Sequence, residues 1–431
     1  MSTLKVNKIR DTSGSADAIT LDPSGGAVLA GVTTISTARV TTGITSTSLQ
    51  VGAAVTIRES GIEASGIGIT CANINGTQIG GRRNIVINGA MNIAQRNTTS
   101  TTSGYTTLDR WNNSYSADAS MTFTQHTLTS SDSGPYEEGF RYSNHAANGD
   151  TAAGGTQSLN WQQPIEAQNV SLSGWNYTSP SSFITLSFWA KSSVGQTFNM
   201  SVMATDGTIK NFPFDVTLAA NTWTKVIKTI PGNSGLQIDN DAGEGFRINI
   251  NVFTGTTYTS DSVTNDTWQN WASGSRFRDS DATWFTTNGA TFEYTGVQLE
   301  VGSQATAFEH RSFGEELRLC QRYYCHTYPY TVYPGANYNS DSNARRGMLF
   351  NYRQRDTNYQ AFQWSPPVEM RTVPTQTHYS MLGTAGKASG STSDFTVATN
   401  NPHNGPTGVM CYGDNTIPND GYVHFVLRAE L

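Results

Sequence analysis

The chain has 431 residues, of which 36% are hydrophobic and 14% are charged, and its formal net charge is −6. The chain has no surplus of basic residues, which argues against a nucleic-acid partner. It contains no run of 18 apolar residues, so no membrane span is predicted. The first 15 residues lack the apolar stretch of a signal peptide, so we expect synthesis in a cytoplasm. If the protein acts outside the cell, we expect it to leave by lysis within a particle.

The composition favours β-structure over disorder, because charge is low and aromatic residues make up 10% of the chain. Ser, Thr, Asn and Gly are abundant in place of hydrophobic and charged residues, which is typical of short strands joined by turns. The four cysteines have no spacing typical of a metal site, and we expect reduced, mostly buried thiols at positions 71, 320, 325 and 411.

Residues 1–82 contain no Trp, Phe or Tyr. Aliphatic residues alternate in short stretches such as 49–51, 55–57 and 67–69, and glycines separate these stretches. Strands so short cannot build a core within one chain. We therefore expect three chains to share them in a thin β-shaft whose N-terminal end docks on a larger particle. A flexible linker is the alternative.

Residues 83–311 are predicted to form one β-sandwich, since many short alternating segments are separated by turns. The predicted strands are 120–126, 183–190, 198–203, 223–230, 246–253 and 291–299. Trp111, Trp189 and Trp223 lie in alternating segments and are assigned to the core. Residues 254–290 form a long irregular insertion with three further tryptophans, and a loop of that length is usually functional or an interface.

The segment 295–324 links the sandwich to the C-terminal part of the chain. Val297, Leu299 and Val301 alternate with Gln298 and Glu300, which predicts a half-buried strand ended by Gly302 and Ser303. Ser312 and Glu315 have the spacing of a capping box, so a helix should begin there. Four residues then follow at steps of four, three and four, as in a coiled-coil seam, and we expect either a three-fold trimer interface or packing on the chain's own domain: Phe313, Leu317, Cys320 and Tyr324.

Residues 326–431 are predicted to form a second β-rich unit. Segments 348–352 and 359–364 should pair as a hairpin around the turn 355–358. The alternating segment 422–431 should close the sheet. Tyrosines are concentrated near the start of this unit.

No motif of a known catalytic type is present, and sequence alone cannot place the two neighbouring carboxylates that a glycosidase needs. We therefore expect no enzyme activity and no cofactor. Asp239, Asp241 and Glu244 resemble a calcium loop loosely, but a solvated turn is the simpler interpretation and no metal site is predicted.

Sugar binding needs flat aromatic faces beside planar polar side chains. Two groups of residues fit this description, although each aromatic member could instead serve a core or an interface. The candidate receptor-binding residues are Tyr328, Tyr330, Tyr333, Asn337, Tyr338, Asp341, Arg345 and Arg346 in the C-terminal unit, and Trp268 and Trp271 in the insertion, where Trp284 competes with them.

Four stretches together resemble a family of tail-fibre proteins from marine and cyanobacterial phages. They are RNIVINGAMNIAQRNTT…YTTLDRW (83–111), QLEVGSQATAFEHRSFGEELRLCQRYY (298–324), PVEMRTVPT (367–375) and HFVLRAEL (424–431). The resemblance covers about residues 83–431. It implies a jelly-roll domain, of the kind found in carbohydrate-binding modules, that ends in the Q-L-E-x-G strand, followed by a short helix and a C-terminal tip.

The sequence thus predicts an all-β homotrimeric tail fibre, found in the virion tail and synthesised in the host cytoplasm. We expect an attachment and shaft region at 1–82, a jelly roll at 83–311, a trimerisation helix at 312–325 and a receptor-binding tip at 326–431. The N-terminus would dock on other tail proteins such as an adaptor or nozzle. The fibre would bind a host polysaccharide or lipopolysaccharide by multivalent adhesion. A polysaccharide depolymerase and a purely structural virion part are the alternatives.

Overall fold

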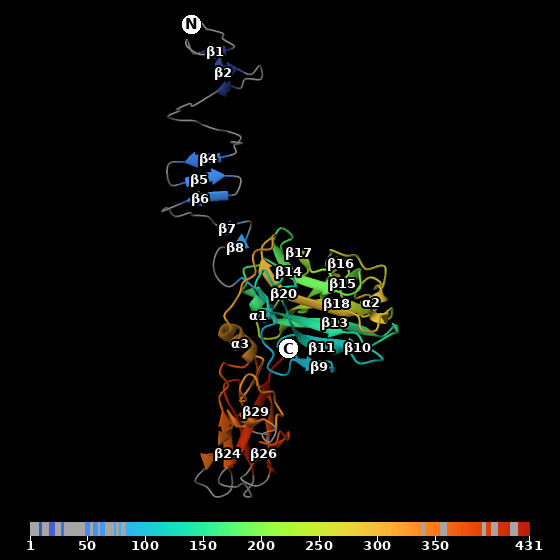
Figure 1. Cartoon of the computed structure of the whole chain (residues 1–431), viewed down its shortest axis with the longest axis vertical. Helices are drawn as coiled ribbons and strands as arrows, with labels where there is room; N and C mark the ends of the chain where they lie inside the picture. The colour runs from blue at the N-terminus through green and yellow to red at the C-terminus, as the bar shows by residue number, and fades with distance from the viewer. Residues whose placement is uncertain are drawn as a thin grey trace. The chain divides into compact units, whose positions relative to one another are not determined.

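The computed structural model describes residues 83–337, 341–350, 352–353, 360–389, 394–397, 404–413 and 421–431, together with short strands between residues 8 and 78. The chain divides into two units, Met1–Cys71 and Ala72–Leu431. Strands predominate in both units (Figure 1), so the predicted all-β class is confirmed. No helix among these residues is long and apolar enough to span a membrane.

The N-terminal unit contains two antiparallel sheets of three short strands. Register pairs Leu49 with Ile57 and Val51 with Val55, so the predicted aliphatic strands are present there. Ile67 and Ile69 lie outside the described residues, and a shaft shared by three chains stays a prediction. The strands are β1 (Lys8–Arg10), β2 (Asp17–Leu21), β3 (Ala27–Leu29), β4 (Ser48–Val51), β5 (Val55–Arg58) and β6 (Gly61–Ala64); β7 (Asn73–Ile74) and β8 (Thr77–Gln78) pair within the second unit.

The second unit begins with a β-sandwich of the predicted jelly-roll kind, built from two six-stranded sheets. The first sheet has the order β10 (Asn112–Ser116), β13 (Ser158–Glu166), β18 (Glu244–Thr254), β15 (Gln196–Ala204), β16 (Lys210–Leu218) and β19 (Gln269–Asn270). The second has the order β17 (Thr224–Pro231), β14 (Phe183–Ser192), β20 (Thr291–Val301), β12 (Tyr142–Ala147), β11 (Thr122–Thr127) and β9 (Thr99–Ser100). All six predicted strands are present, within a few residues at each end.

The inner faces of the two sheets form one large apolar core. Trp111 and Trp284 are fully buried in it, so Trp111 is confirmed as a core residue and Trp284 is not available to a ligand. Trp284 belongs to the short helix α2 (Thr283–Thr286). The prediction was wrong for Trp189 and Trp223: both are only partly buried and pack in a smaller cluster around Phe140.

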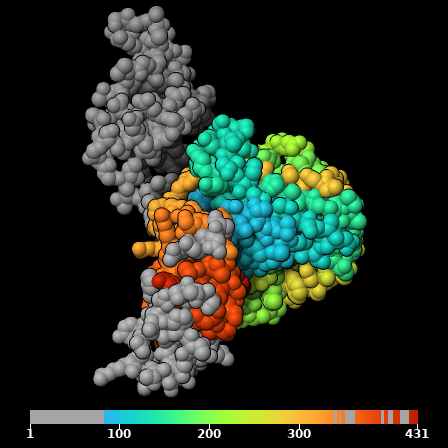
Figure 2. All heavy atoms as spheres, turned by 60° about the horizontal axis from the view of Figure 1, so that its bottom comes forward, coloured from blue at the N-terminus to red at the C-terminus, as the bar shows by residue number. Residues whose placement is uncertain are grey.

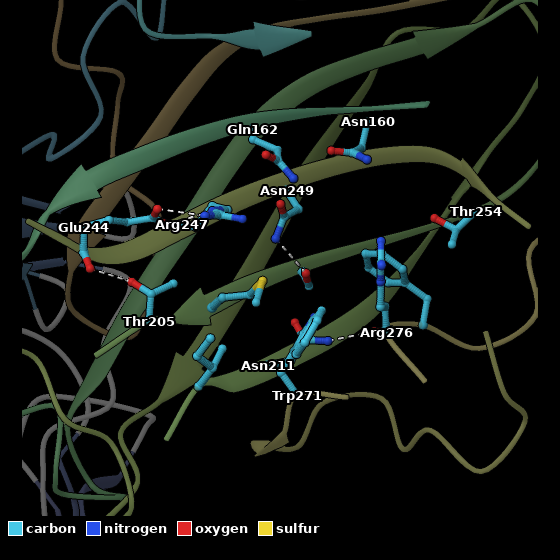
Figure 3. A pocket seen from close by; sticks show the side chains of 14 residues that line it. Asn160, Gln162, Thr205, Asn211, Glu244, Arg247, Asn249, Thr254, Trp271 and Arg276 are labelled. Carbon is cyan, nitrogen blue, oxygen red and sulfur yellow. Dashed lines mark hydrogen bonds and ion pairs between the residues drawn. The ribbon is translucent and has the colours of Figure 1, made fainter. Parts of the chain in front are cut away.

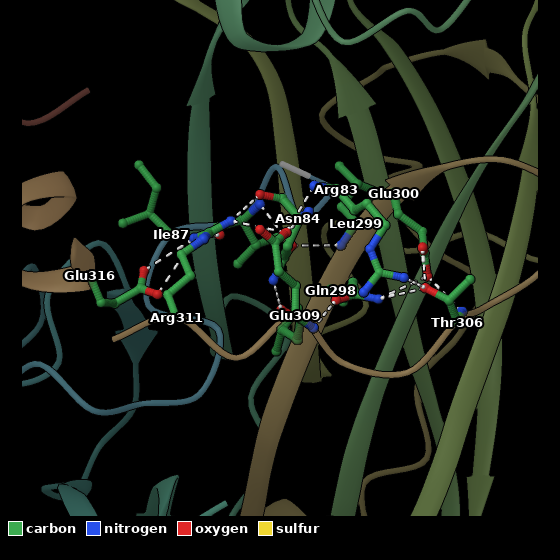
Figure 4. Close-up of polar contacts among 12 residues, drawn as sticks. Arg83, Asn84, Ile87, Gln298, Leu299, Glu300, Thr306, Glu309, Arg311 and Glu316 are labelled. Atoms are coloured by element: carbon green, nitrogen blue, oxygen red, sulfur yellow. Dashed lines mark hydrogen bonds and ion pairs between the residues drawn. The ribbon is translucent and has the colours of Figure 1, made fainter. Parts of the chain in front are cut away.

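Strand β20 is buried on both faces, so the prediction of a half-buried strand was wrong. Its polar face is covered by chain rather than by water, because segment 303–311 hydrogen-bonds to it. The Glu300 carboxylate accepts from the backbone and hydroxyl of Thr306 at 2.8 and 2.6 Å, and the Gln298 side chain accepts from the Glu309 N–H at 2.8 Å. Figure 4 shows these contacts beside Arg83 and Asn84.

Helix α3 (Phe313–Gln321) begins at the predicted cap, where the Ser312 hydroxyl accepts from the Glu315 N–H at 3.3 Å. The helix packs on the first residues of the sandwich. Cys320 joins Ile87 and Ile93 in a small apolar cluster, and Glu316 accepts from the Asn88 N–H at 2.5 Å.

This packing corrects part of the predicted trimer seam. Cys320 is buried within its own chain, and Tyr324 lies beyond the helix in strand β21 (Tyr324–His326), where it is 1% exposed. Leu317 is half-buried against the same cluster. Only Phe313, at 49% exposed, presents a large open apolar surface, so the seam cannot be a continuous stripe for a partner chain.

The C-terminal unit is built around strand β29 (Tyr422–Arg428), which pairs with four other strands. These are β21, β22 (Leu349–Phe350), β25 (Thr375–Tyr379) and β26 (Lys387–Ser389), and β27 (Asp394–Thr396) pairs with β26. Strands β23 (Tyr352–Arg353), β24 (Gln360–Trp364) and β28 (Val409–Gly413) form a separate sheet. The predicted hairpin between 348–352 and 359–364 is correct only in part: Tyr352 pairs with Ala361, but Leu349 and Phe350 pair with β29 instead. The turn 355–358 lies outside the described residues.

A buried polar joint connects the sandwich to the C-terminal unit, and Figure 2 shows the red C-terminal residues lying against the sandwich. Glu430 pairs with Arg96 at 2.5 Å and with Arg110, whose side chains are 6% and 1% exposed. The Arg110 guanidinium also stacks on Tyr323 at 3.5 Å. A second ion pair of the joint links Arg322 to Glu166. Two further residues belong to the joint. Asp109 pairs with Arg96 at 2.8 Å, and the Tyr324 ring lies 3.7 Å from the Arg96 guanidinium.

Cys320, Cys325 and Cys411 are free, buried thiols, as predicted, and burial raises the pKa of each. Cys71 lies outside the described residues.

Candidate functional site

A cleft with polar and apolar lining residues lies on the outer face of the first sheet, with a volume of about 430 Å³. Its floor comes from four neighbouring strands, and one wall comes from the insertion 254–290 (Figure 3). The lining side chains are Asn160, Gln162, Ser201, Met203, Thr205, Ile209, Asn211, Glu244, Arg247, Asn249, Thr254, Trp271, Arg276 and Phe277.

Strand register aligns the polar floor. Gln162 on β13 pairs with Asn249 on β18, which pairs with Ser201 on β15. In the next row, Arg247 on β18 pairs with Met203 on β15, which pairs with Asn211 on β16. Because side chains alternate between faces, two such rows place planar amide groups and one guanidinium on the same surface.

The floor exists because these strands alternate strictly. Phe246, Ile248 and Ile250 of β18 point into the core and are fully buried. Arg247 and Asn249 therefore point to the opposite face, where they line the cleft. One hydrophobic pattern thus fixes both the core and the floor.

Several floor amides keep unused hydrogen-bonding capacity. Asn249 donates to Ser201 at 3.1 Å, and Asn211 donates to the Arg276 carbonyl at 2.7 Å. The side-chain oxygens of Asn160 and Asn211 are buried and have no partner among the described residues. A buried acceptor without a partner costs about 1–3 kcal/mol. A hydroxyl group of a ligand could supply the missing donors once the amides turn toward it.

The wall of the cleft carries Trp271, one of the predicted candidates. Its backbone N–H donates to the Ile209 carbonyl at 2.9 Å, which anchors the loop to the sheet, and its ring remains half-buried. Trp268, the other predicted tryptophan, packs on the core beside Phe212 and donates to the Pro231 carbonyl at 2.7 Å. Only Trp271 of the two lines the cleft.

The acidic residues near the cleft contact other groups of the chain. Both carboxylate oxygens of Glu244 are engaged by Arg247, at 2.6 and 2.7 Å. Burial, together with the charges of Asp239, Asp241 and Glu244, raises the pKa of Asp206. No group of three potential metal ligands is brought together within the described part of the chain. Residues 240–243 form a bend in the connection from β17 to β18, which lie in different sheets, so the predicted hairpin turn is wrong.

The C-terminal candidates are dispersed. Tyr328 is 4% exposed and stacks on His424 with ring centroids 3.6 Å apart, so the expectation that it contacts a receptor is corrected. The Tyr330 hydroxyl accepts from the Ala94 N–H at 3.0 Å, which makes it a contact between the C-terminal unit and the sandwich. Tyr333 is half-buried.

None of the remaining C-terminal candidates lines the cleft on the sandwich. Asn337 is half-buried, Arg346 is exposed, and Asp341 caps the short helix η1 (Ser342–Arg345) by accepting from the Asn343 N–H at 2.9 Å. Tyr338 and the side chain of Arg345 lie outside what the structure describes. These residues stay predictions.

Sequence reasoning missed the floor of the cleft. Asn160, Gln162 and Asn211 lie in β13 and β16, which were not predicted, and Asn249 lies in a strand whose outer face was not considered. A usable signal was present in segment 246–253, where Arg and Asn alternate with large apolar residues. Arg and Asn side chains at every second position of a central strand are a signal of a binding face on the side of the sheet that faces away from the core.

No protein-family model matches the chain, and no curated protein matches it. Among solved structures, the tailspike protein 4 enzymatically active domain of bacteriophage CBA120 is similar with a TM-score of 0.28 and 15% identity, covering 51% of this chain and 21% of that one. The family 11 carbohydrate-binding module of the Clostridium thermocellum cellulase Lic26A-Cel5E is similar with a TM-score of 0.24 and 10% identity, covering 50% and 98%. A putative sugar binding protein from Bacteroides thetaiotaomicron has a TM-score of 0.26 and 11% identity, covering 51% and 99%.

The chain therefore spans about a fifth of the tailspike domain and nearly all of the two smaller proteins. Each similarity covers about half of this chain. Similarity at these scores carries no functional argument. The function of the sandwich is therefore inferred from the residues that line the cleft.

Proposed function

We propose that this chain is a phage tail fibre that attaches the particle to a glycan of the host surface by non-catalytic binding in the cleft. The observation that carries the proposal is the combination of planar amides on the floor with the half-buried Trp271 on the wall. Sugars offer hydroxyl groups to amides and C–H faces to aromatic rings, and this cleft presents both kinds of surface.

The composition of the cleft supports binding over cleavage. Glycoside hydrolysis by the usual route needs two carboxyl groups about 5–9.5 Å apart. Glu244 is the only carboxylate among the residues that line the cleft, and Arg247 occupies both of its oxygens. A depolymerase site would have to lie elsewhere.

The tail-fibre part of the proposal rests on the four stretches that resemble phage fibres, and all four meet at the joint. The third contributes Arg371, whose side chain donates to the Glu430 carbonyl at 2.8 Å. Arg96 and Arg110 belong to the first stretch, Arg322 and Tyr323 to the second, and Glu430 to the last. The stretches that carry the resemblance thus include the residues that hold the C-terminal unit to the sandwich. Residues 1–82 would attach the fibre to other tail proteins.

Three chains per fibre would multiply weak binding. Linked sites raise avidity by ~10²–10⁴ without a new kind of contact. Light scattering of the full-length protein tests this part: a mass three times that of the 46.6 kDa chain is expected. A monomer would exclude the shared shaft and leave each cleft to act alone.

Replacement of Trp271 tests the binding site. We expect W271A in the full chain to weaken retention on host polysaccharide, measured by affinity electrophoresis, by about tenfold or more. Adsorption to host cells should fall in parallel. The matched control is W223A, which removes a partly buried tryptophan from the outer face of the other sheet. Equal binding by W271A and the wild type, with both folded, would refute the cleft as the glycan site.

A further inference from the structure

The two arginines that line the cleft are in different electrostatic states. Figure 3 shows Arg247 beside Glu244 at one end and Arg276 toward the other. The Arg247 side chain forms a bidentate ion pair with Glu244, and the two side chains are 28% and 18% exposed. That pair is neutral as a unit, so Arg247 has little charge left for a ligand.

Arg276 has no such carboxylate partner. Among the described residues it takes part in no ion pair within 4 Å, and its guanidinium donates only to the carbonyl and hydroxyl oxygens of Ser273, at 3.2 and 3.5 Å. These are neutral acceptors. With one glutamate and two arginines among the charged lining residues, the cleft carries one net positive charge, and that charge lies at Arg276.

Arg276 is nevertheless held in position. Its guanidinium stacks on the Tyr258 ring at 4.1 Å and lies 5.6 Å from the Trp271 ring. Its backbone N–H donates to the Tyr258 carbonyl at 2.9 Å, and its carbonyl accepts from Asn211. A guanidinium ordered before a ligand arrives loses less entropy on binding and can engage a planar anion through two parallel N–H donors.

We propose that the cleft selects an acidic glycan, with Arg276 binding a carboxylate or sulfate group on a sugar that packs near Trp271. The inference rests on the proposed function, since it names the ligand class of the same cleft. Uronic acids and sulfate esters present the same chemistry here: an exposed anion on the edge of a sugar ring. The amides of the floor serve the uncharged hydroxyl groups of the chain on either side.

The test uses the full-length protein and pairs of polysaccharides that differ in charge. Polygalacturonate is compared with its highly methyl-esterified form, and a sulfated galactan is compared with its desulfated form, by affinity electrophoresis and titration calorimetry. We expect the acidic member of at least one pair to bind about tenfold more tightly at low salt. The preference should shrink as salt is raised. The pair that shows it distinguishes carboxylate from sulfate.

Variants assign the effect to one side chain. R276Q should lose about tenfold in affinity for the acidic polymer and change affinity for the neutral polymer by less than about twofold. R278Q is the matched control, because it removes the same charge from an exposed position two residues away that does not line the cleft. R276K should recover only part of the affinity, since an ammonium group lacks the planar pair of donors.

The outcomes separate the two proposals. If neutral and acidic polymers bind equally and binding depends on Trp271, the cleft is a glycan site but the acidic preference is refuted. The same holds if R276Q and R278Q weaken acidic binding equally. If no polysaccharide binds in a Trp271-dependent way, both the glycan site and its acidic preference are refuted.

Discussion

The cleft and the joint are both polar, but they differ in how completely their groups are satisfied. In the joint, Glu430 pairs with Arg110 and Arg96, both nearly inaccessible to solvent, and Asp109 gives Arg96 a second carboxylate. Among the described residues, Arg110 Nε is the one buried side-chain atom of the joint without a partner. In the cleft, amide oxygens lack partners and Arg276 lacks a counter-ion among the described residues. Satisfied buried charges hold parts of one chain in a fixed arrangement, whereas unsatisfied groups at a surface are available for another molecule.

A fall in pH should produce the largest difference in stability between the C-terminal unit and the sandwich that carries the cleft. His326, His378 and His424 are buried in the C-terminal unit, and burial lowers the pKa of each from 6.5 to about 4. The unfolded chain therefore binds more protons than the folded chain between about pH 6.5 and 4, so stability is present above this range and is lost as pH falls through it. The loss is up to about 3 kcal/mol for each histidine.

Hydrogen exchange at about pH 7, 5.5 and 4.5, corrected for intrinsic exchange rates, measures this difference. Amides of β29 should lose protection as pH falls, while those of β18 under the cleft should change less. His126 is partly exposed in the sandwich, and H126Q serves as a control that should not alter the response. Equal loss of protection in β29 and β18 would mean that acid acts on the whole molecule rather than on the C-terminal unit.

Removing the charge of Glu430 should have the next largest effect. E430Q leaves the buried Arg110 without its carboxylate, and breaking a buried pair by removing one partner costs about 3–5 kcal/mol. Chemical denaturation of the full chain should show the C-terminal unit unfolding at lower denaturant. Glycan binding by the sandwich should persist below that transition.

The control for this variant is E137Q, because Glu137 is exposed on the sandwich and is not part of the joint. E137Q should change the free energy of unfolding by less than about 0.5 kcal/mol. If E430Q proved as stable as E137Q, the joint would owe its stability to apolar contacts instead of its ion pairs.

The smallest change in stability is expected in the cleft. Gln162 makes no hydrogen bond through its side chain among the described residues and is half-buried on the floor. Q162A should therefore change the free energy of unfolding by less than about 0.5 kcal/mol but weaken glycan binding severalfold. Thermal unfolding and affinity electrophoresis on the same sample measure both. Unchanged binding would remove Gln162 from the contact surface.

The sequence predicted strands where apolar alternation was strong and failed where polar residues interrupted it. Segment 246–253 was recognised, whereas β13 was not, because its inner face includes the polar Gln163 and Pro164 lies within it. The helix start at Ser312 depended only on neighbouring residues and was therefore predictable. The burial of Cys320 depended on residues 87–93, more than about 220 positions earlier in the chain, and could not be read locally.

The candidate site was predictable only in part for the same reason. Trp271 was selected because it lies in a long loop, a property visible in sequence. The joint required the pairing of Glu430 with Arg96 and Arg110, which lie 334 and 320 residues away in the chain. The seam at helical spacing left a partner chain and the chain's own domain open as alternatives, and Cys320 and Leu317 pack on the sandwich residues Ile87 and Ile93.

The position of β29 in its sheet has a consequence for how the molecule reaches its native state. Strands β21, β22, β25 and β26 span residues 324–389, yet each pairs with the segment Tyr422–Arg428. They cannot form these pairs until that segment has been translated, and only β26 has an earlier partner, β27, among the described strands. Such high contact order slows folding and exposes strand edges in the meantime. The yield of folded chain would thus depend on a late, slow step of folding, one that a chaperone could assist.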